Sequence, residues 1–222
     1  MTPGIQKQLA KSDPVLGQLI RRVGQCVIDL DPRRTPFQSL VSAVAHQQLN
    51  GTAAGTILRR FRALFPGKRF PAATDLASVT DEALRGAGFS RGKIASIRDI
   101  AAKTESGVVP ASRQIARLSD AEIIERLTVI RGVGQWTVEM LLIFKLGRPD
   151  VLPATDFGIR SGFALTYGHE ELPPPQKILE YGERWRPYRT TAAWYLWRAV
   201  DLARRQSEVE KVKPKNHPKT KS

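Results

Sequence analysis

The chain lacks features that define several classes of protein. Cys26 is its one cysteine, which excludes an internal disulfide, a four-cysteine iron–sulfur cluster and a four-cysteine zinc finger. No run of 18 apolar residues exists, and residues 1–25 contain no apolar core of a signal peptide, so we expect an intracellular protein without a membrane segment. His46 has no metal-ligand partner at useful spacing, so the sequence predicts no metal site.

Negative charge is scarce as well. The 222 residues include 35 lysines and arginines against 21 aspartates and glutamates, a net charge of +14. This excess favours a polyanionic partner, because the summed field attracts and retains phosphates. The alternative is a basic soluble protein without such a partner. With 41% hydrophobic residues, the chain can bury a core as one large domain or two interleaved small ones.

Strand signals are also missing, because the β-branched residues fall on helical rather than alternating spacing. Apolar residues predict one helix with polar flanks within residues 1–35, starting after Pro14. Capping patterns at Thr35 and Ser119 predict further helix starts, and residues 188–205 a last long helix. Residues 207–222 are predicted to form a disordered basic tail. The predicted fold class is all-α.

The most informative stretch runs from Leu127 to Arg160. It contains a helix end, the turn Gly132-Val133-Gly134, a second helix and a lone aspartate after a proline. Both glycines can take positive φ and let a phosphate approach the backbone, and the free N–H groups of the next helix face that phosphate. We therefore expect this turn, with Thr137 in the first turn of the following helix, to bind DNA without reading its sequence. The alternative is an ordinary glycine helix cap.

With Trp136 and the LPATD segment, this stretch resembles the helix-hairpin-helix DNA glycosylases, in particular the DNA-3-methyladenine glycosylase II type. The resemblance extends from about Phe37 to Trp197. It implies two helical subdomains with a DNA cleft between them: residues 36–146, which include the hairpin at 127–146, and residues 1–35 with 147–206. It also implies a monomer that acts on damaged double-stranded DNA in the cytoplasm or nucleoid. No organic cofactor is implied, although hairpin carbonyls in this family can hold a monovalent cation.

Asp156 is the candidate catalytic residue. Breaking an N-glycosidic bond passes through an oxocarbenium-like sugar, which a carboxylate can stabilise while it orients or deprotonates water. The next helix is predicted to start at about Phe157, and a helix N-terminus favours the ionised carboxylate. An aspartate at this position can also be only an N-cap, and the two roles are compatible.

Two tryptophans are candidate walls of a base pocket. Trp136 stands where family members that also cut the strand carry a lysine nucleophile, so the resemblance implies a monofunctional enzyme. Trp197 lies in a run similar to the family's last helix, which would let it stack on the extruded base. Two aromatic faces suit a cationic alkylated purine. Met140 stands one turn after Trp136, where relatives carry an aromatic residue and where it can line the pocket. For Trp136 the alternative is an ordinary core side chain.

The loop after the first central helix is the candidate probe of the DNA duplex. The family uses this loop to fill the gap left by the extruded nucleotide, and residue-by-residue matching puts the plug at Gln48 and the minor-groove probe at Asn50. An apolar plug would act as a wedge, whereas glutamine can offer hydrogen bonds to the orphaned base. The alternative is a polar helix terminus.

Together these residues predict a monofunctional DNA glycosylase that excises alkylated purines such as 3-methyladenine by hydrolysis in base excision repair. Two alternatives stay open. One is a glycosylase with the same machinery but a pocket for a different lesion. The other is a non-catalytic helix-hairpin-helix DNA-binding protein, against which Asp156 and the two tryptophans argue.

Overall fold

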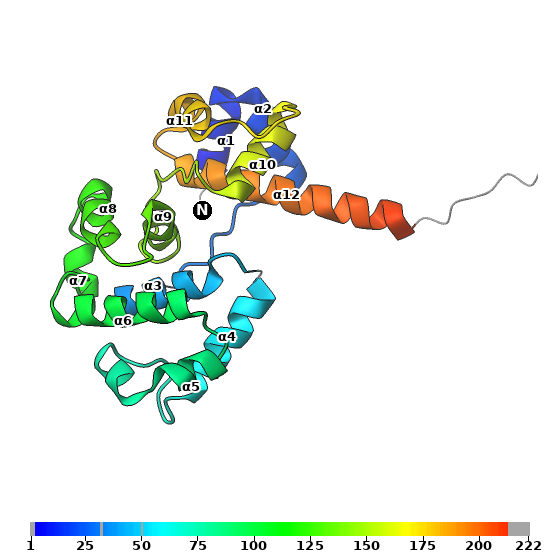
Figure 1. The fold of residues 1–222 in the computed structure, drawn as a ribbon. Coiled ribbons are helices and arrows are strands. Elements are labelled where there is room, and N and C mark those ends of the chain that lie inside the picture. The colour runs from blue at the N-terminus through cyan, green and yellow to red at the C-terminus, as the bar shows by residue number, and fades with distance from the viewer. Residues whose placement is uncertain (1–2, 32, 50, 213–222) are drawn as a thin grey trace, which may run out of the picture. The chain divides into compact units, whose positions relative to one another are not determined.

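The computed structural model describes residues 3–31, 33–49 and 51–212. Within these ranges the chain forms α-helices and short 3-10 helices and no strand, so the predicted all-α fold is confirmed (Figure 1). Over the same part of the chain, no helix combines the length and the apolar character that a membrane crossing needs.

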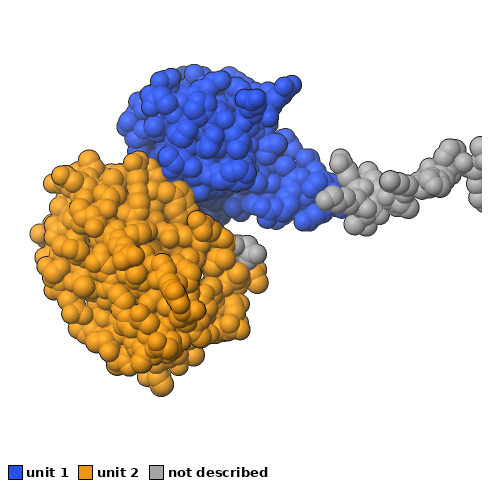
Figure 2. All heavy atoms as spheres, viewed as in Figure 1, with its two compact units in different colours: residues 1–28, 149–222 blue, residues 29–148 orange. Residues whose placement is uncertain are grey.

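Two compact units divide the chain, unit 1 with residues 1–28 and 149–222 and unit 2 with residues 29–148 (Figure 2). We expected the limits at 35/36 and 146/147, whereas residues 29–35 and 147–148 group with unit 2. In the segment of residues 29–35, the backbone N–H of Asp31 donates to the carbonyl of Phe144 at 3.2 Å. That hydrogen bond joins the segment before the first helix of unit 2 to the last one.

Unit 2 contains the central helices. In chain order they are α3 (Pro36–His46), α4 (Gly51–Ala63), η1 (Thr74–Ser78), α5 (Asp81–Gly86), α6 (Arg91–Glu105), α7 (Ser112–Ile115), α8 (Asp120–Thr128) and α9 (Gln135–Phe144). The predicted capping box begins α3: Thr35 Oγ1 accepts from the N–H of Gln38, whose side chain accepts from the N–H of Thr35. α3 packs against α6 and α9. It therefore supports both α6 and the second helix of the hairpin, α9.

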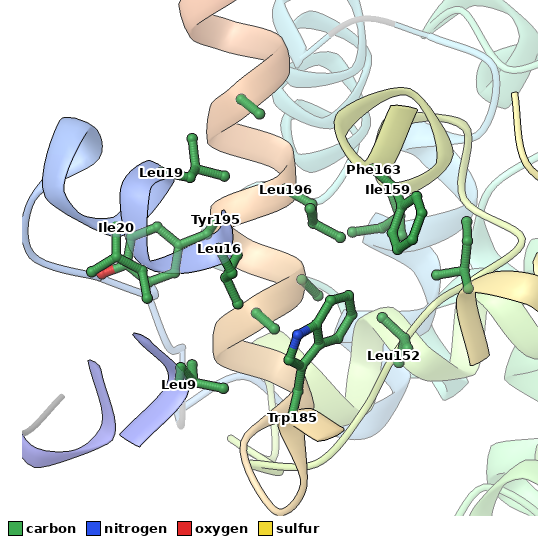
Figure 3. Packing of buried hydrophobic residues seen from close by; sticks show 14 of the residues in the cluster. Leu9, Leu16, Leu19, Ile20, Leu152, Ile159, Phe163, Trp185, Tyr195 and Leu196 are labelled. Carbon is green, nitrogen blue, oxygen red and sulfur yellow. The ribbon is translucent and has the colours of Figure 1, made fainter. Parts of the chain in front are cut away.

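Unit 1 contains both ends of the chain. Its helices are α1 (Pro3–Ser12), α2 (Pro14–Val23), α10 (Phe157–Tyr167), α11 (Pro175–Gly182), η2 (Glu183–Trp185) and α12 (Arg189–Val212). Their apolar side chains form one core that includes Leu16 of α2, Phe163 of α10, and Tyr195 and Leu196 of α12 (Figure 3). The N-terminal helices therefore depend on the C-terminal half of the chain for their burial.

The prediction of a single helix within residues 1–35 is wrong. The chain forms α1 and α2, which separate at Asp13 because Pro14 has no N–H to continue the helix. Asp13 caps α2 through the N–H of Leu16 at 3.0 Å. Asp13 is 1% exposed. Its other oxygen accepts from the hydroxyl of Tyr167 at 2.7 Å and from the indole N–H of Trp185 at 2.9 Å, which compensates the burial of the carboxylate. This buried carboxylate thus connects the start of α2 with α10 and η2.

The predicted disordered tail at residues 207–222 is wrong for its first part. Residues 207–212 continue α12, which ends at Val212, and residues 213–222 lie outside the described part of the chain. The helix extends further than we expected because the sequence places no proline after Pro187 until Pro214.

Candidate active site and hairpin

Asp156 lies in unit 1 where an extended segment meets α10. Residues 151–154 of that segment are buried, so the segment runs through the core and brings Asp156 to a half-buried position. Asp156 Oδ1 accepts from the backbone N–H of Ile159 at 2.9 Å. Asp156 is therefore the N-cap of α10, as the sequence suggested, and its catalytic role stays a separate prediction.

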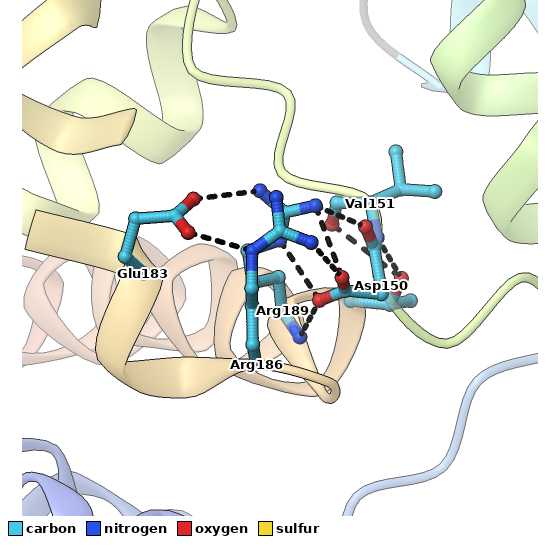
Figure 4. A network of polar contacts seen from close by, with 6 residues as sticks. Asp150, Val151, Glu183, Arg186 and Arg189 are labelled. Atoms are coloured by element: carbon cyan, nitrogen blue, oxygen red, sulfur yellow. Dashed lines mark hydrogen bonds and ion pairs between the residues drawn. The ribbon is translucent and has the colours of Figure 1, made fainter. Parts of the chain in front are cut away.

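The start of α12 holds the segment that leads to Asp156 (Figure 4). Arg189 Nε donates to Asp150 Oδ1 at 2.8 Å, and Arg186 Nη1 donates to Asp150 Oδ2 at 2.7 Å. Glu183 accepts from both arginines, and the hydrogen bond from Arg186 holds the pKa of Glu183 below its ordinary value. Two carboxylates and two guanidinium groups thus fix the beginning of the segment.

The same helix reaches the segment at two further points. Thr190 Oγ1 accepts from the backbone N–H of Val151 at 2.9 Å. About two turns further along α12, Trp197 Nε1 donates to Asp156 Oδ1 at 2.9 Å. Two N–H donors therefore converge on one carboxylate oxygen, which restricts the rotation of the carboxylate. We predicted Trp197 as a stacking surface, and this role stays a prediction; the hydrogen bond to Asp156 was not predicted.

The hairpin lies in unit 2 between α8 and α9. Ile130 and Val133 are each 2% exposed, so apolar packing anchors the turn in the core of unit 2. Gly132 has φ of 72°, and a Cβ built there would lie 2.1 Å from Ser96 Oγ on α6. Gly134 has φ of −85°, so only one of the two glycines uses the positive φ that we expected to be open to both. A Cβ on Gly134 would meet nothing within 4 Å, which leaves the N-terminus of α9 open to approach.

Polar contacts fasten the hairpin to neighbouring elements of unit 2. Asp99 Oδ2 on α6 accepts from the backbone N–H of Arg131 at 2.8 Å. Gln47, the residue after α3, donates from Nε2 to the carbonyl of Gly132 at 2.9 Å and to Thr137 Oγ1 at 3.0 Å. The hairpin and the loop that starts at Gln47 are therefore joined directly.

The loop of residues 47–49, which we call the plug loop, is also held by Lys93. Lys93 Nζ donates to the carbonyls of Ala45 at 2.9 Å and Gln47 at 2.8 Å. This cation satisfies carbonyl groups at the C-terminal end of α3, and burial lowers its pKa. Gln48 is exposed and has φ of 58°, the one positive φ of a non-glycine residue in the described ranges. Asn50, the predicted groove probe, lies outside the described residues.

The remaining predicted site residues lie on α9. Trp136 and Met140 are half-buried and stand four residues apart, so they share one face of the helix. Thr137 is 2% exposed, and its hydroxyl accepts from Gln47 rather than facing outward. The pocket roles of Trp136 and Met140 and the DNA-binding role of Thr137 stay predictions.

Sequence reasoning missed the residues that support these groups. Gln47 and Lys93 support the plug loop, and Gly158 packs beside the contact between Asp156 and Trp197. A signal existed for Gly158, because Gly158 and Gly162 form a glycine pair at four-residue spacing that allows close helix approach. No local pattern marks Gln47 or Lys93, since their partners are distant in sequence.

Comparison with known proteins places these elements in one family. Residues 41–187 match the HhH-GPD superfamily of base excision DNA repair proteins. The chain is 42% identical over 185 residues to DNA-3-methyladenine glycosylase 1 of Schizosaccharomyces pombe, covering 83% of this chain and 80% of that protein. It is 30% identical over 201 residues to the alkylbase DNA glycosidase-like protein mag2 of the same yeast, covering 90% and 94%.

Solved structures agree with this placement. The S. pombe 3-methyladenine DNA glycosylase in complex with abasic DNA superposes with a TM-score of 0.85 at 39% identity, over 90% of this chain and 98% of that one. A DNA-3-methyladenine glycosidase from Bacillus halodurans superposes with a TM-score of 0.78 at 38% identity, over 91% and 92%. The chain therefore belongs to the HhH-GPD superfamily of base excision DNA repair proteins.

Proposed function

We propose that this chain is a monofunctional DNA glycosylase that removes alkylated purines of the 3-methyladenine kind from double-stranded DNA. The observation that carries the proposal is the Asp156 carboxylate, held on one oxygen by the N–H groups of Ile159 and Trp197. The similar yeast and bacterial proteins, which are named as 3-methyladenine glycosylases or glycosidases, support the same substrate class.

The proposed reaction uses this carboxylate as an electrostatic partner of the sugar. The bond between C1′ and the base nitrogen breaks, and its electron pair neutralises the positive charge of the alkylated base. The sugar becomes oxocarbenium-like, and the negative charge of Asp156 stabilises it. Water then bonds to C1′ and releases its proton to Asp156 or to solvent. A cationic base already leaves readily, so this chemistry needs no strong general acid.

Trp136 supports hydrolysis without strand cleavage. An indole cannot form the Schiff base that a lysine at this position forms in the lyase members of the family. We therefore expect free base and an intact abasic strand as products. Borohydride should trap no covalent complex between the protein and DNA.

The hairpin supports DNA binding that is independent of sequence. The open space at Gly134 exposes the start of α9, whose first-turn N–H groups can donate to a phosphate. Contacts to phosphate position a protein on DNA without specifying bases. The net charge of +14 adds a salt-dependent attraction, and the hydrogen bonds from Gln47 hold the plug loop beside the hairpin.

Asp156→Asn tests the proposal directly. On duplex DNA methylated to contain 3-methyladenine, the single-turnover rate of base release should fall by at least about 100-fold, because losing one preorganised transition-state contact costs about that much. DNA affinity should stay close to that of the wild type. Asp29→Asn makes the same change at an exposed aspartate and should keep the wild-type rate.

The outcomes separate the alternatives. A wild-type rate in Asp156→Asn would refute the catalytic role of the carboxylate. A wild-type protein that binds methylated DNA and releases no base would refute the alkylpurine assignment. Release of a different base from duplexes with oxidised or mismatched bases would then identify another lesion class, and no release from any duplex would leave a binding protein.

A further inference from the structure

Gly158, in the first turn of α10, lies where a side chain does not fit. A Cβ built on it would lie 2.9 Å from Trp197 Cδ1, 3.1 Å from Trp197 Nε1 and 3.0 Å from Asp156 Oδ1. These are the indole and the oxygen that form the 2.9 Å hydrogen bond between α12 and α10. The space left by Gly158 is therefore directly beside that bond.

A second glycine on the same helix sets the approach of the two backbones. A Cβ built on Gly162 would lie 2.0 Å from the carbonyl oxygen of Leu196, so α10 and α12 pack backbone against backbone there. Gly158 and Gly162 share one face of α10 because they are four residues apart. Trp197 follows Leu196, so the close approach at Gly162 brings the indole to the N-terminal turn of α10.

The two glycines differ in what they contact. Gly162 contacts main-chain atoms of Leu196, which is a packing role. The atoms within 4 Å of a Cβ on Gly158 that lie closest belong to the side chains of Trp197 and Asp156. A methyl group at 158 would therefore act on the orientation of these two side chains.

We propose that Gly158 is a positioning residue for the catalytic carboxylate, because its missing side chain leaves the space in which the Trp197 indole donates to Asp156. The inference rests on the proposed function of Asp156. The indole is rigid and Asp156 is held by the N–H of Ile159, so the methyl group of Gly158→Ala must shift the indole relative to Oδ1 and weaken their hydrogen bond. Loss of a hydrogen bond to a charged group then slows base release.

The first readout of Gly158→Ala is the indole N–H itself. In protein labelled with ¹⁵N-tryptophan, the four tryptophans give four indole resonances, and the one absent from Trp197→Phe belongs to Trp197. Gly158→Ala and Asp156→Asn should both shift the Trp197 resonance. The Trp185 resonance, whose N–H donates to Asp13, should stay in place. An unmoved Trp197 resonance in Gly158→Ala overturns the proposal.

The second readout is the single-turnover rate on methylated duplex. Gly158→Ala should lower it by about tenfold or more, which is the low end for a lost hydrogen bond to a charged group. Gly55→Ala is the matched control, because a Cβ on this glycine inside α4 meets nothing within 4 Å; it should keep the wild-type rate. A wild-type rate in Gly158→Ala also overturns the proposal.

A double variant distinguishes positioning from general damage. In a Trp197→Ala background neither the indole ring nor its N–H remains, so Gly158→Ala should cost no more than about twofold. A full tenfold further loss contradicts the proposal. If Gly158→Ala alone does not fold, Trp197→Ala must restore folding by removing the ring that the methyl strikes, and a double variant that stays unfolded overturns it. A wild-type rate in Asp156→Asn would instead defeat the proposed function, while the indole resonance would still report on the contact.

Discussion

Gln47→Leu tests whether the hairpin and the plug loop bind DNA as one element. Leucine has a similar volume but cannot donate to the carbonyl of Gly132 or to Thr137 Oγ1. The loop should then be held mainly by Lys93, which bonds only the backbone carbonyls of Ala45 and Gln47. We expect Gln47→Leu to remain folded and to lose order in the plug loop.

The magnitude follows from the two lost bonds. A neutral hydrogen bond contributes about 0.5–1.5 kcal/mol net, so the two together should lower the unfolding free energy by about 1–3 kcal/mol. The upper part of this range applies because Thr137 is 2% exposed and its hydroxyl loses a partner. The loss of DNA-binding free energy cannot exceed the free energy that these two hydrogen bonds contribute, which at 3 kcal/mol corresponds to about 150-fold in affinity. We expect the affinity to fall about tenfold.

Two measurements decide the outcome. Denaturant titration gives the change in unfolding free energy, and fluorescence anisotropy at fixed salt gives the affinity for a duplex that carries an abasic-site analogue. Gln8→Leu removes an exposed glutamine of α1 and should change neither quantity. If Gln47→Leu keeps wild-type stability and affinity, the bonds to the hairpin contribute nothing and the two segments bind DNA independently.

Two further predictions concern single side chains. Trp197→Ala should slow release of 3-methyladenine by at least about one or two decades, because it removes a stacking surface worth about 1–3 kcal/mol and also the hydrogen bond to Asp156. Rates on a neutral lesion should fall less, since only a cation gains from the ring quadrupole. An equal loss on both lesions would remove the charge argument. Cys26 is 1% exposed, and burial raises its pKa to about 11, so iodoacetamide at pH 8 should modify it only in urea. The folded-state pKa of Cys26 lies above the ordinary value of 9.0. The thiol's contribution to the unfolding free energy is therefore complete below about pH 9 and lost as the pH rises through 11. A denaturation midpoint that rises over this pH range in the wild type relative to Cys26→Ala would contradict this prediction.

The helix starts could be predicted because capping is a local interaction. Thr35 and Ser119 each accept a hydrogen bond from an N–H three residues ahead, so a short pattern contains all the atoms involved. The start of α2 at Pro14 is local in the same way, but the burial of its cap Asp13 could not be predicted from a short pattern. Asp13 is buried because Tyr167 and Trp185 donate to it, and these partners lie more than 150 residues away.

The candidate site likewise contains one contact that is local in sequence and one that is distant. Asp156 as an N-cap depends on Ile159, three residues away, and was visible in the sequence. The indole bond from Trp197 spans 41 residues. Matching to a family assigns each residue a position but does not say that one of them donates to another. For this reason we predicted Asp156 and Trp197 separately and missed the contact that joins them.

The glycines show why the remaining details require the structure. Gly132 and Gly134 look equivalent in the sequence, yet Gly132 is required by its positive φ and by Ser96 beneath it, whereas Gly134 has ordinary φ and open space before it. Gly158 meets a third requirement, because its neighbours are the two side chains of the proposed catalytic contact. A glycine can be needed for backbone conformation, for close packing or for access, and these needs lead to different consequences on substitution. Only the atoms that surround each Cα separate them, and those atoms come from segments that no local pattern connects.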